Sequence, residues 1–232
     1  MMNTSQKHNL TYQLTHDLGN AIVKGKYKIG DGLPTEAELC TEYDVSRSAT
    51  REAVKMLSAK GLIVSRPKKG IRVLPESNWN MFDTDVLSWI LSSNPSLTLL
   101  KSFTEVRAAI EPQAAALASV NATFEDIEEI ENALKRMEAA ENGLDDPLDS
   151  DIAFHTAILK ASGNCFIRQL TDFISTALRV SIRYTNKTKG EAGDIQKHAD
   201  ILDTIKSRNP EKAHSAVKNI LDEALELINS NL

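Results

Sequence analysis

The sequence predicts a mainly α-helical protein in two parts: three helices with a β-hairpin, followed by a longer, all-helical segment. Only 5% of the residues are aromatic, while Ala, Leu and Ile are plentiful, a composition that favours helices over sheets. Beyond residue 82, apolar residues recur at helical spacing and no run has the alternation of a strand. At 232 residues, the chain is long enough for two modest domains, each with its own core.

Glycines and capping residues divide the first part into elements. Leu14, Leu18, Ile22 and Val23 form one apolar stripe and predict the first helix, which ends before two glycines, at 25 and 30. Thr35 with Glu38 has capping-box spacing and predicts the start of the second helix. Ser46 can cap the third helix, whose predicted buried side consists of Ala49, Ala53, Val54 and Leu57.

A hairpin and a linker follow these helices. The runs 62–65 and 70–74 are β-rich and flank a basic turn at 66–69. Residues 75–78, Pro-Glu-Ser-Asn, have the composition of a linker, so we predict domains 1–77 and 78–232. Helices are expected at 83–92, 96–119, 123–141, 147–162, 165–184, 194–208 and 210–230.

Charge is distributed unevenly along the chain. Residues 1–77 contain twelve Lys and Arg against eight Asp and Glu, whereas the remainder contains fifteen against twenty-four. This asymmetry is typical of an anion-binding module joined to a different domain. The amino terminus lacks the apolar core of a signal peptide and no segment is apolar enough to span a bilayer, so we expect a cytoplasmic protein. Cys40 and Cys165 show no metal-ligand or redox spacing and are expected to be reduced thiols.

The second and third predicted helices, with a tight turn between them, fit a helix-turn-helix. In that motif, the first turn of the second helix enters the major groove of DNA. Arg47 and Arg51 lie four residues apart on one face and can contact guanine or phosphate. Ser46, Ser48 and Thr50 can donate to phosphate oxygens. The basic hairpin turn is a candidate wing, with Arg66, Lys68, Lys69 and Arg72 in or beside it. The alternative is a solvated basic helix in an unrelated domain.

Three features of the second part can form a ligand site. Asp151 and His155 are four residues apart on one predicted helix, and His198 lies on a later helix. Arg107 lies among apolar residues, where a guanidinium is costly unless it meets an anion, which makes it a candidate carboxylate clamp. The alternatives are a surface Asp151–His155 pair, a partly exposed His198, and an Arg107 that pairs with Glu111.

The first part resembles the winged helix of the GntR superfamily. The resemblance is carried by Gly-Asp-Gly-Leu-Pro-Thr-Glu at 30–36, Val-Ser-Arg at 45–47, Arg-Glu-Ala at 51–53, Gly-Leu-Ile at 61–63 and the glycine at 70. It implies a transcription regulator in which Arg47, Ser48, Ala49 and Arg51 face operator DNA, with Lys69 and Gly70 at the wing. Ala37 stands where the family often has Arg, so a contact made there by relatives is expected to be absent.

The second part resembles the FCD domain of the FadR-type GntR subfamily, an antiparallel helical bundle. Glu-Val-Arg at 105–107, Ile-Glu-Pro at 110–112, the run Asp-Ile-Ala-Phe-His at 151–155 and the His198 segment carry the resemblance. In many members, an Asp and three His bind a divalent metal that helps hold a carboxylate effector. This implies a metal such as Zn, Ni or Mn on Asp151, His155 and His198.

The chain departs from that ligand set at the third His, where alignment of the last helix places Ile220. His214 lies six residues earlier, about 240° away around the helix, and cannot substitute. Two options stay open: a metal with three protein ligands completed by water or effector, or the same residues hydrogen-bonding a hydroxylated acid directly.

The residues around the linker indicate a class of effector. The segment 78–89, with Trp79 and Trp89, resembles the sugar-acid regulators of the family, which implies an aldonate such as D-galactonate. The alternative for Trp79 and Trp89 is simple packing of a linker helix against the bundle. We expect a homodimer on a palindromic operator, and a repressor that the effector releases, the opposite sign staying open. The rival functions are a metal-dependent enzyme using Asp151, His155 and His198, and an effector-independent dimeric DNA-binding protein.

Overall fold

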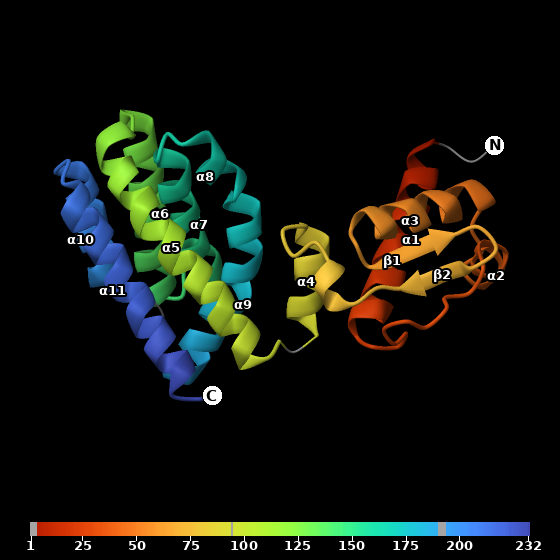
Figure 1. Cartoon of the computed structure of the whole chain (residues 1–232). Helices are drawn as coiled ribbons and strands as arrows, with labels where there is room; N and C mark the ends of the chain where they lie inside the picture. The colour runs from red at the N-terminus through yellow and green to blue at the C-terminus, as the bar shows by residue number, and fades with distance from the viewer. Residues whose placement is uncertain (1–3, 94, 190–193) are drawn as a thin grey trace. The chain divides into compact units, whose positions relative to one another are not determined.

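The computed structural model describes residues 4–93, 95–189 and 194–232 (Figure 1). It is mainly helical, with one two-stranded sheet among these residues, as predicted. The chain forms two compact units, residues 1–94 and 95–232. None of the described helices is long and apolar enough to cross a membrane.

The first unit is a winged helix-turn-helix. Its helices α1 (Thr4–Val23), α2 (Glu36–Glu42) and α3 (Arg47–Ala59) are followed by the antiparallel strands β1 (Ile63–Arg66) and β2 (Gly70–Val73). The capping box of Thr35 and Glu38 and the Ser46 cap begin α2 and α3 as predicted. The apolar stripe of α1 packs with the buried side of α3 and with the inward residues of the hairpin to form one core.

The end of this unit lies further along the chain than the predicted boundary at 77/78. A short 3-10 turn, η1 (Glu76–Asn78), leads to α4 (Thr84–Ser92), and Trp79, Val86 and Trp89 are buried in the core of the first unit. The two compact units therefore divide at 94/95. Packing of Trp79 and Trp89 against the bundle was the wrong alternative, because both indoles belong to the winged-helix core. Gly19 of α1 lies so close to Trp89 that an added Cβ would be 2.2 Å from the ring.

The second unit is an all-helical bundle. It consists of α5 (Leu97–Asn121), α6 (Phe124–Glu141), α7 (Pro147–Ala161), α8 (Cys165–Gln169), α9 (Thr171–Lys189), α10 (Ile195–Lys206) and α11 (Pro210–Asn229). Helix α5 packs antiparallel to α11, and α6 packs antiparallel to α7 (Figure 1). Polar caps at Thr123, Asp146 and Asn209 begin α6, α7 and α11, and each of these helices starts within one residue of the expected position. The single helix expected at 165–184 is instead broken at Leu170, which caps the end of α8.

Candidate functional site

The candidate DNA-binding face begins at the turn between α2 and α3. Asp44 has a φ of 50°, a left-handed conformation that Asp tolerates better than most side chains, and it lies within the four residues that connect α2 to α3. The side chain of Ser46 then accepts a hydrogen bond from the main-chain nitrogen of Ala49, which fixes the first turn of α3. The sequence therefore places the amino end of α3 on a short, defined turn.

The structure separates the predicted operator-facing residues of α3 into two groups. Arg47, Ser48 and Arg51 are exposed, whereas Ala49 is buried on the core side of the helix. Thr50 was wrongly assigned as a phosphate donor, because it is fully buried and its hydroxyl contacts the Ser46 carbonyl oxygen at 3.2 Å. The exposed face therefore presents two guanidinium groups and a hydroxyl.

The turn of the hairpin is shaped as a wing. Lys68 and Gly70 have positive φ values of 63° and 74°, and Lys69 between them is exposed. Arg66 and Arg72 are also exposed, but Arg72 donates from Nη1 to the Gly30 carbonyl oxygen at 3.0 Å. Arg72 therefore also tethers the hairpin to the preceding loop.

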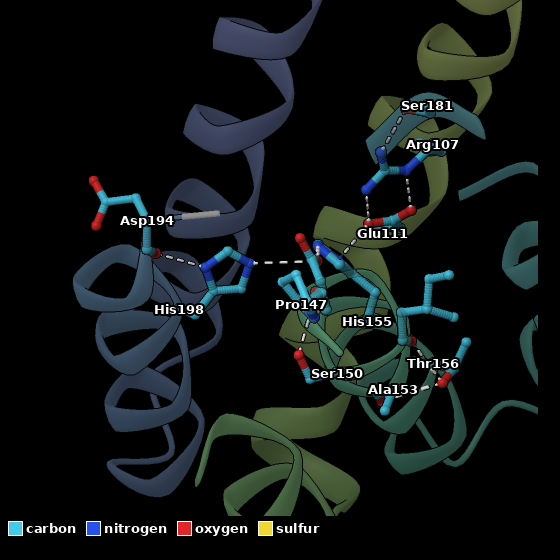
Figure 2. A network of polar contacts seen from close by, with 12 residues as sticks. Arg107, Glu111, Pro147, Ser150, Ala153, His155, Thr156, Ser181, Asp194 and His198 are labelled. Carbon is cyan, nitrogen blue, oxygen red and sulfur yellow. Dashed lines mark hydrogen bonds and ion pairs between the residues drawn. The ribbon is translucent and has the colours of Figure 1, made fainter. Parts of the chain in front are cut away.

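The second candidate site is a buried cluster of ionisable side chains in the helical unit. Asp151 and His155 come from α7 and His198 from α10, and one ligand atom from each lies within 4.8 Å of the others. All three side chains are buried, so the surface alternatives for Asp151, His155 and His198 were wrong. Figure 2 shows the rings of His155 and His198 on either side of this centre. Their packing against Phe154, whose ring centroid lies 5.0 Å from that of His198, restricts the imidazoles.

Arg107 and Glu111 extend the cluster along α5. Arg107 donates to Glu111 from Nε at 2.6 Å and from Nη2 at 3.2 Å, and Nη1 donates to the hydroxyl of Ser181 on α9 at 3.3 Å. The Arg107–Glu111 pair that the sequence left open is therefore present. A guanidinium has five N–H donors, so two of those of Arg107 have no partner among the described residues.

Sequence reasoning named Glu111 only as an alternative partner of Arg107 and not as a member of the Asp151–His155–His198 site. Its Oε2 lies 3.0 Å from Nδ1 of His155, so one carboxylate contacts both Arg107 and a candidate metal ligand (Figure 2). The spacing of Glu111 to Arg107 gave a signal, but the contact with His155 joins two helices and has no local signature.

Charge pairing sets the protonation of the cluster. Burial favours neutral Glu111, yet the charges of Arg107 and His155 lower its pKa to about 2. Burial likewise favours a neutral ring at His155, but Glu111 and Asp151 raise its pKa to about 9. The pKa of His198 is lowered, because burial outweighs the attraction of Asp151.

Two buried atoms at the centre lack a hydrogen bond among the described residues. Nδ1 of His198 lies 2.6 Å from the main-chain oxygen of Asp194, so it must carry the ring hydrogen, and Nε2 then presents a lone pair. That Nε2 lies 3.8 Å from Oδ1 of Asp151, an oxygen that also forms an ion pair with Nε2 of His155 at 3.2 Å. Neither Oδ1 of Asp151 nor Nε2 of His198 has a hydrogen bond among the described residues. Two facing acceptors in a buried site are costly unless a cation lies between them, so the residues fit a divalent metal.

The last helix does not supply a further His to this group. Ile220 is half-buried on α11 and packs against the apolar core of the bundle, and His214 is half-buried one and a half turns earlier on the same helix. The group found among the described residues therefore has three members.

Comparison with known proteins identifies both units. Residues 10–73 match the model of the gntR family of bacterial regulatory proteins, and residues 102–223 match the FCD domain. The chain is a member of the GntR family. The galactonate operon transcriptional repressor of Escherichia coli K12 is 34% identical over 92% of this chain and 94% of its own length. The regulator LutR of Bacillus subtilis strain 168 is 33% identical over 72% of this chain and 74% of its own.

Solved structures share the fold. The structure of Lar, which controls expression of the Listeria monocytogenes agr system, has a TM-score of 0.61 over 99% of both chains at 17% identity. A putative GntR regulator of Rhodococcus sp. RHA1 has a TM-score of 0.51 at 20% identity, over 96% of this chain and 98% of its own. This GntR-family chain is therefore a DNA-binding transcription regulator with an FCD domain, and its matched families and relatives are regulators rather than enzymes.

Proposed function

We propose that this regulator is a homodimeric repressor that leaves its operator when the FCD domain binds a sugar acid of the aldonate class, such as D-galactonate. Similarity to a galactonate operon repressor over nearly the whole chain supports the effector class. A homodimer doubles the contacts that one winged helix makes, across a twofold-symmetric operator. Operator binding also requires a cytoplasmic location in a bacterium.

The observation that carries the metal in this proposal is the pair of buried atoms Asp151 Oδ1 and His198 Nε2, which lie 3.8 Å apart and have no hydrogen bond among the described residues. We assign this site a divalent metal, Zn, Ni or Mn, held by Asp151, His155 and His198. Such an ion would supply positive charge and open coordination positions for effector oxygens. With three protein ligands, coordination positions would remain on the ion for the carboxylate and hydroxyl of an α-hydroxy acid.

The charge of the loaded cluster favours an effector with a single carboxylate. A metal-ligating His155 is neutral, so the buried charges are those of Arg107, Glu111, Asp151 and a divalent cation. They sum to one positive charge, which one carboxylate neutralises, whereas a diacid would leave a buried excess of negative charge. The two remaining Arg107 donors suit that carboxylate.

The effector test compares two ligands that differ at one end of the carbon chain, where galactarate has a second carboxylate and D-galactonate has a primary alcohol. D-galactonate is expected to raise the melting temperature and weaken operator binding in a gel shift, and the diacid galactarate to do neither. Loss of the response in chelator, with recovery on Zn²⁺, supports the metal. A response that persists in chelator would favour direct hydrogen bonding, and tighter operator binding with D-galactonate would reverse the sign. If no acid alters either measurement, the helical unit serves dimerisation alone.

The DNA-binding face is tested separately. Arg47→Ala and Arg51→Ala are each expected to weaken specific operator binding by about 1–3 kcal/mol, because each guanidinium can contact a guanine. Arg51 lies 3.6 Å from Glu36, but this exposed pair is weak and leaves the guanidinium free to move. Lys55→Ala, an exposed substitution further along α3, is the control. Unchanged affinity in both arginine variants would contradict the assigned face.

A further inference from the structure

Glu111 makes one contact more than it needs to neutralise Arg107. Its carboxylate contacts the guanidinium through both oxygens, at 2.6 and 3.2 Å, and Oε2 also contacts Nδ1 of His155 at 3.0 Å (Figure 2). A carboxylate that served only as a counter-ion would need the first two contacts alone. The third joins α5 to α7 at a residue that belongs to the Asp151–His155–His198 group.

The contact with Glu111 determines which nitrogen of His155 faces the other members of the group. Because Nδ1 lies against a carboxylate, it carries a hydrogen, and Nε2 points to Asp151 Oδ1 at 3.2 Å. His198 is oriented in the same sense, but by the main-chain oxygen of Asp194. Histidines that bind metals commonly donate their second nitrogen to such a partner, which fixes the ring and raises its basicity.

Arg107 in turn prevents Glu111 from acting as a ligand itself. Both carboxylate oxygens are engaged by the guanidinium, which Ser181 holds from the far side at 3.3 Å. Rotation of Glu111 toward Asp151 would break two charged hydrogen bonds in a buried site. The carboxylate is therefore held one residue away from the centre, behind His155.

We propose that Glu111 is a positioning residue for a divalent cation, because it holds His155 as the Nδ1–H tautomer with Nε2 directed at the site. This inference rests on the proposed metal on Asp151, His155 and His198. It predicts that the charge of Glu111 affects how tightly the cation binds, in addition to pairing with Arg107.

The experiment measures Zn²⁺ affinity of the full chain by competition with a chromophoric chelator. Glu111→Gln is expected to bind one Zn²⁺ with about 10–100-fold lower affinity than the unsubstituted chain. Nitrogen-15 NMR of the ring should show His155 as a single Nδ1–H tautomer in the Zn²⁺-loaded chain and a changed ring signal in the variant. The matched control is Glu129→Gln, which removes a carboxylate from an exposed ion pair with Lys160 and leaves both readouts unchanged.

A second pair of variants separates positioning from folding, because Glu111→Gln also leaves the buried Arg107 without its counter-charge. Arg107→Met is the reference, and Arg107→Met with Glu111→Gln is expected to bind Zn²⁺ about 10–100-fold more weakly than that reference. The positioning role is overturned if Glu111→Gln binds Zn²⁺ as tightly as the unsubstituted chain and the double variant binds it as tightly as Arg107→Met. Glu111 would then be a counter-ion only. An unsubstituted chain that binds no Zn²⁺ overturns the metal proposal and this inference together.

Discussion

Each unit of the molecule contains a cluster of charged side chains, partly buried in the first unit and buried in the second, and the two clusters differ in whether their polar atoms are paired. In the winged-helix unit, Nζ of Lys60 lies 2.7 and 2.8 Å from the two oxygens of Asp83 and 2.8 Å from Asp85. These three contacts use all three ammonium hydrogens. In the helical unit, Asp151 Oδ1 and His198 Nε2 have no hydrogen bond among the described residues, although Asp151 forms an ion pair with His155.

The difference indicates different roles. Burial opposes the charge of Lys60, but Asp83 and Asp85 together raise its pKa, so it stays protonated as a structural tie between the end of α3 and α4. The helical cluster keeps two buried polar atoms without a hydrogen bond among the described residues, and this is the basis on which we propose it as a ligand site. We call the Lys60–Asp83–Asp85 group the saturated cluster, because all three hydrogens of its ammonium are paired, and assign it a structural role. We call the Asp151–His155–His198 group the unsaturated cluster and propose that it binds a ligand.

The largest expected effect comes from opening the saturated cluster. Lys60→Met leaves Asp83 and Asp85 facing each other without their cation and should destabilise the first unit by about 3 kcal/mol, the low end for a broken buried pair because both carboxylates are partly exposed. Both tryptophans of the chain lie in this unit, so denaturant unfolding followed by indole fluorescence reports on it.

The control for that substitution is Lys55→Met, which removes an exposed ammonium paired with Glu52 and should cost less than about 1 kcal/mol. A similar, small loss in both variants would mean that the Lys60 cluster is not a structural tie and that the comparison fails.

The second effect is a gain in stability on adding Zn²⁺, which is expected for the unsaturated cluster alone. Zn²⁺ at 100 times its dissociation constant should stabilise the helical unit by about 2.7 kcal/mol, because the ion binds the folded state alone. Thermal unfolding followed by circular dichroism measures this gain, and the fluorescence transition of the first unit should move less. His198→Gln should abolish the gain. A Zn²⁺ shift that persists in this variant would place the cation elsewhere.

Sequence reasoning succeeded where the determining contacts are local. The starts of α2, α3, α6, α7 and α11 follow from a polar cap and the residues just after it, and the structure has each of these caps. The fold class and the family also follow from the sequence, because the motifs that carry them are long and ordered. Asp151 and His155 share a helix face, so their proximity was predictable from their spacing.

The structure differs from the sequence-based predictions where long-range packing determines the contacts. The sequence left open that Trp79 and Trp89 pack against the bundle, yet both enter the core of the first unit. The close approach at Gly19 admits Trp89 onto α1. The Glu111–His155 contact joins two helices, and its partners are 44 positions apart in the sequence. Neither contact leaves a periodic pattern in the sequence.

The third effect tests whether α4, which carries Asp85 of the saturated cluster, packs against α1 through Trp89. Gly19→Ala adds a Cβ that would lie 2.2 to 2.6 Å from ring carbons of Trp89, so the indole must move. Overpacking costs about 1–3 kcal/mol, and the better helix propensity of Ala returns up to about 1 kcal/mol. A net loss of about 1–2 kcal/mol is expected in denaturant unfolding. In a Trp89→Leu background, the same substitution should cost nothing, and an equal cost there would disprove the contact.

The smallest effect comes from the exposed rim of the saturated cluster. The Tyr12 hydroxyl donates to Asp85 at 3.1 Å from a half-exposed side chain, so Tyr12→Phe should cost only about 0.5–1 kcal/mol. The negative charge of Asp85 raises the pKa of Tyr12, because it opposes formation of the phenolate. The contribution of Tyr12 is therefore fully present below pH about 10 and is lost as the pH rises through the folded-state pKa. The contribution is measured as the difference in unfolding free energy between the unsubstituted chain and Tyr12→Phe from pH 8 to 11. A difference that grows with pH would contradict the assigned hydrogen bond.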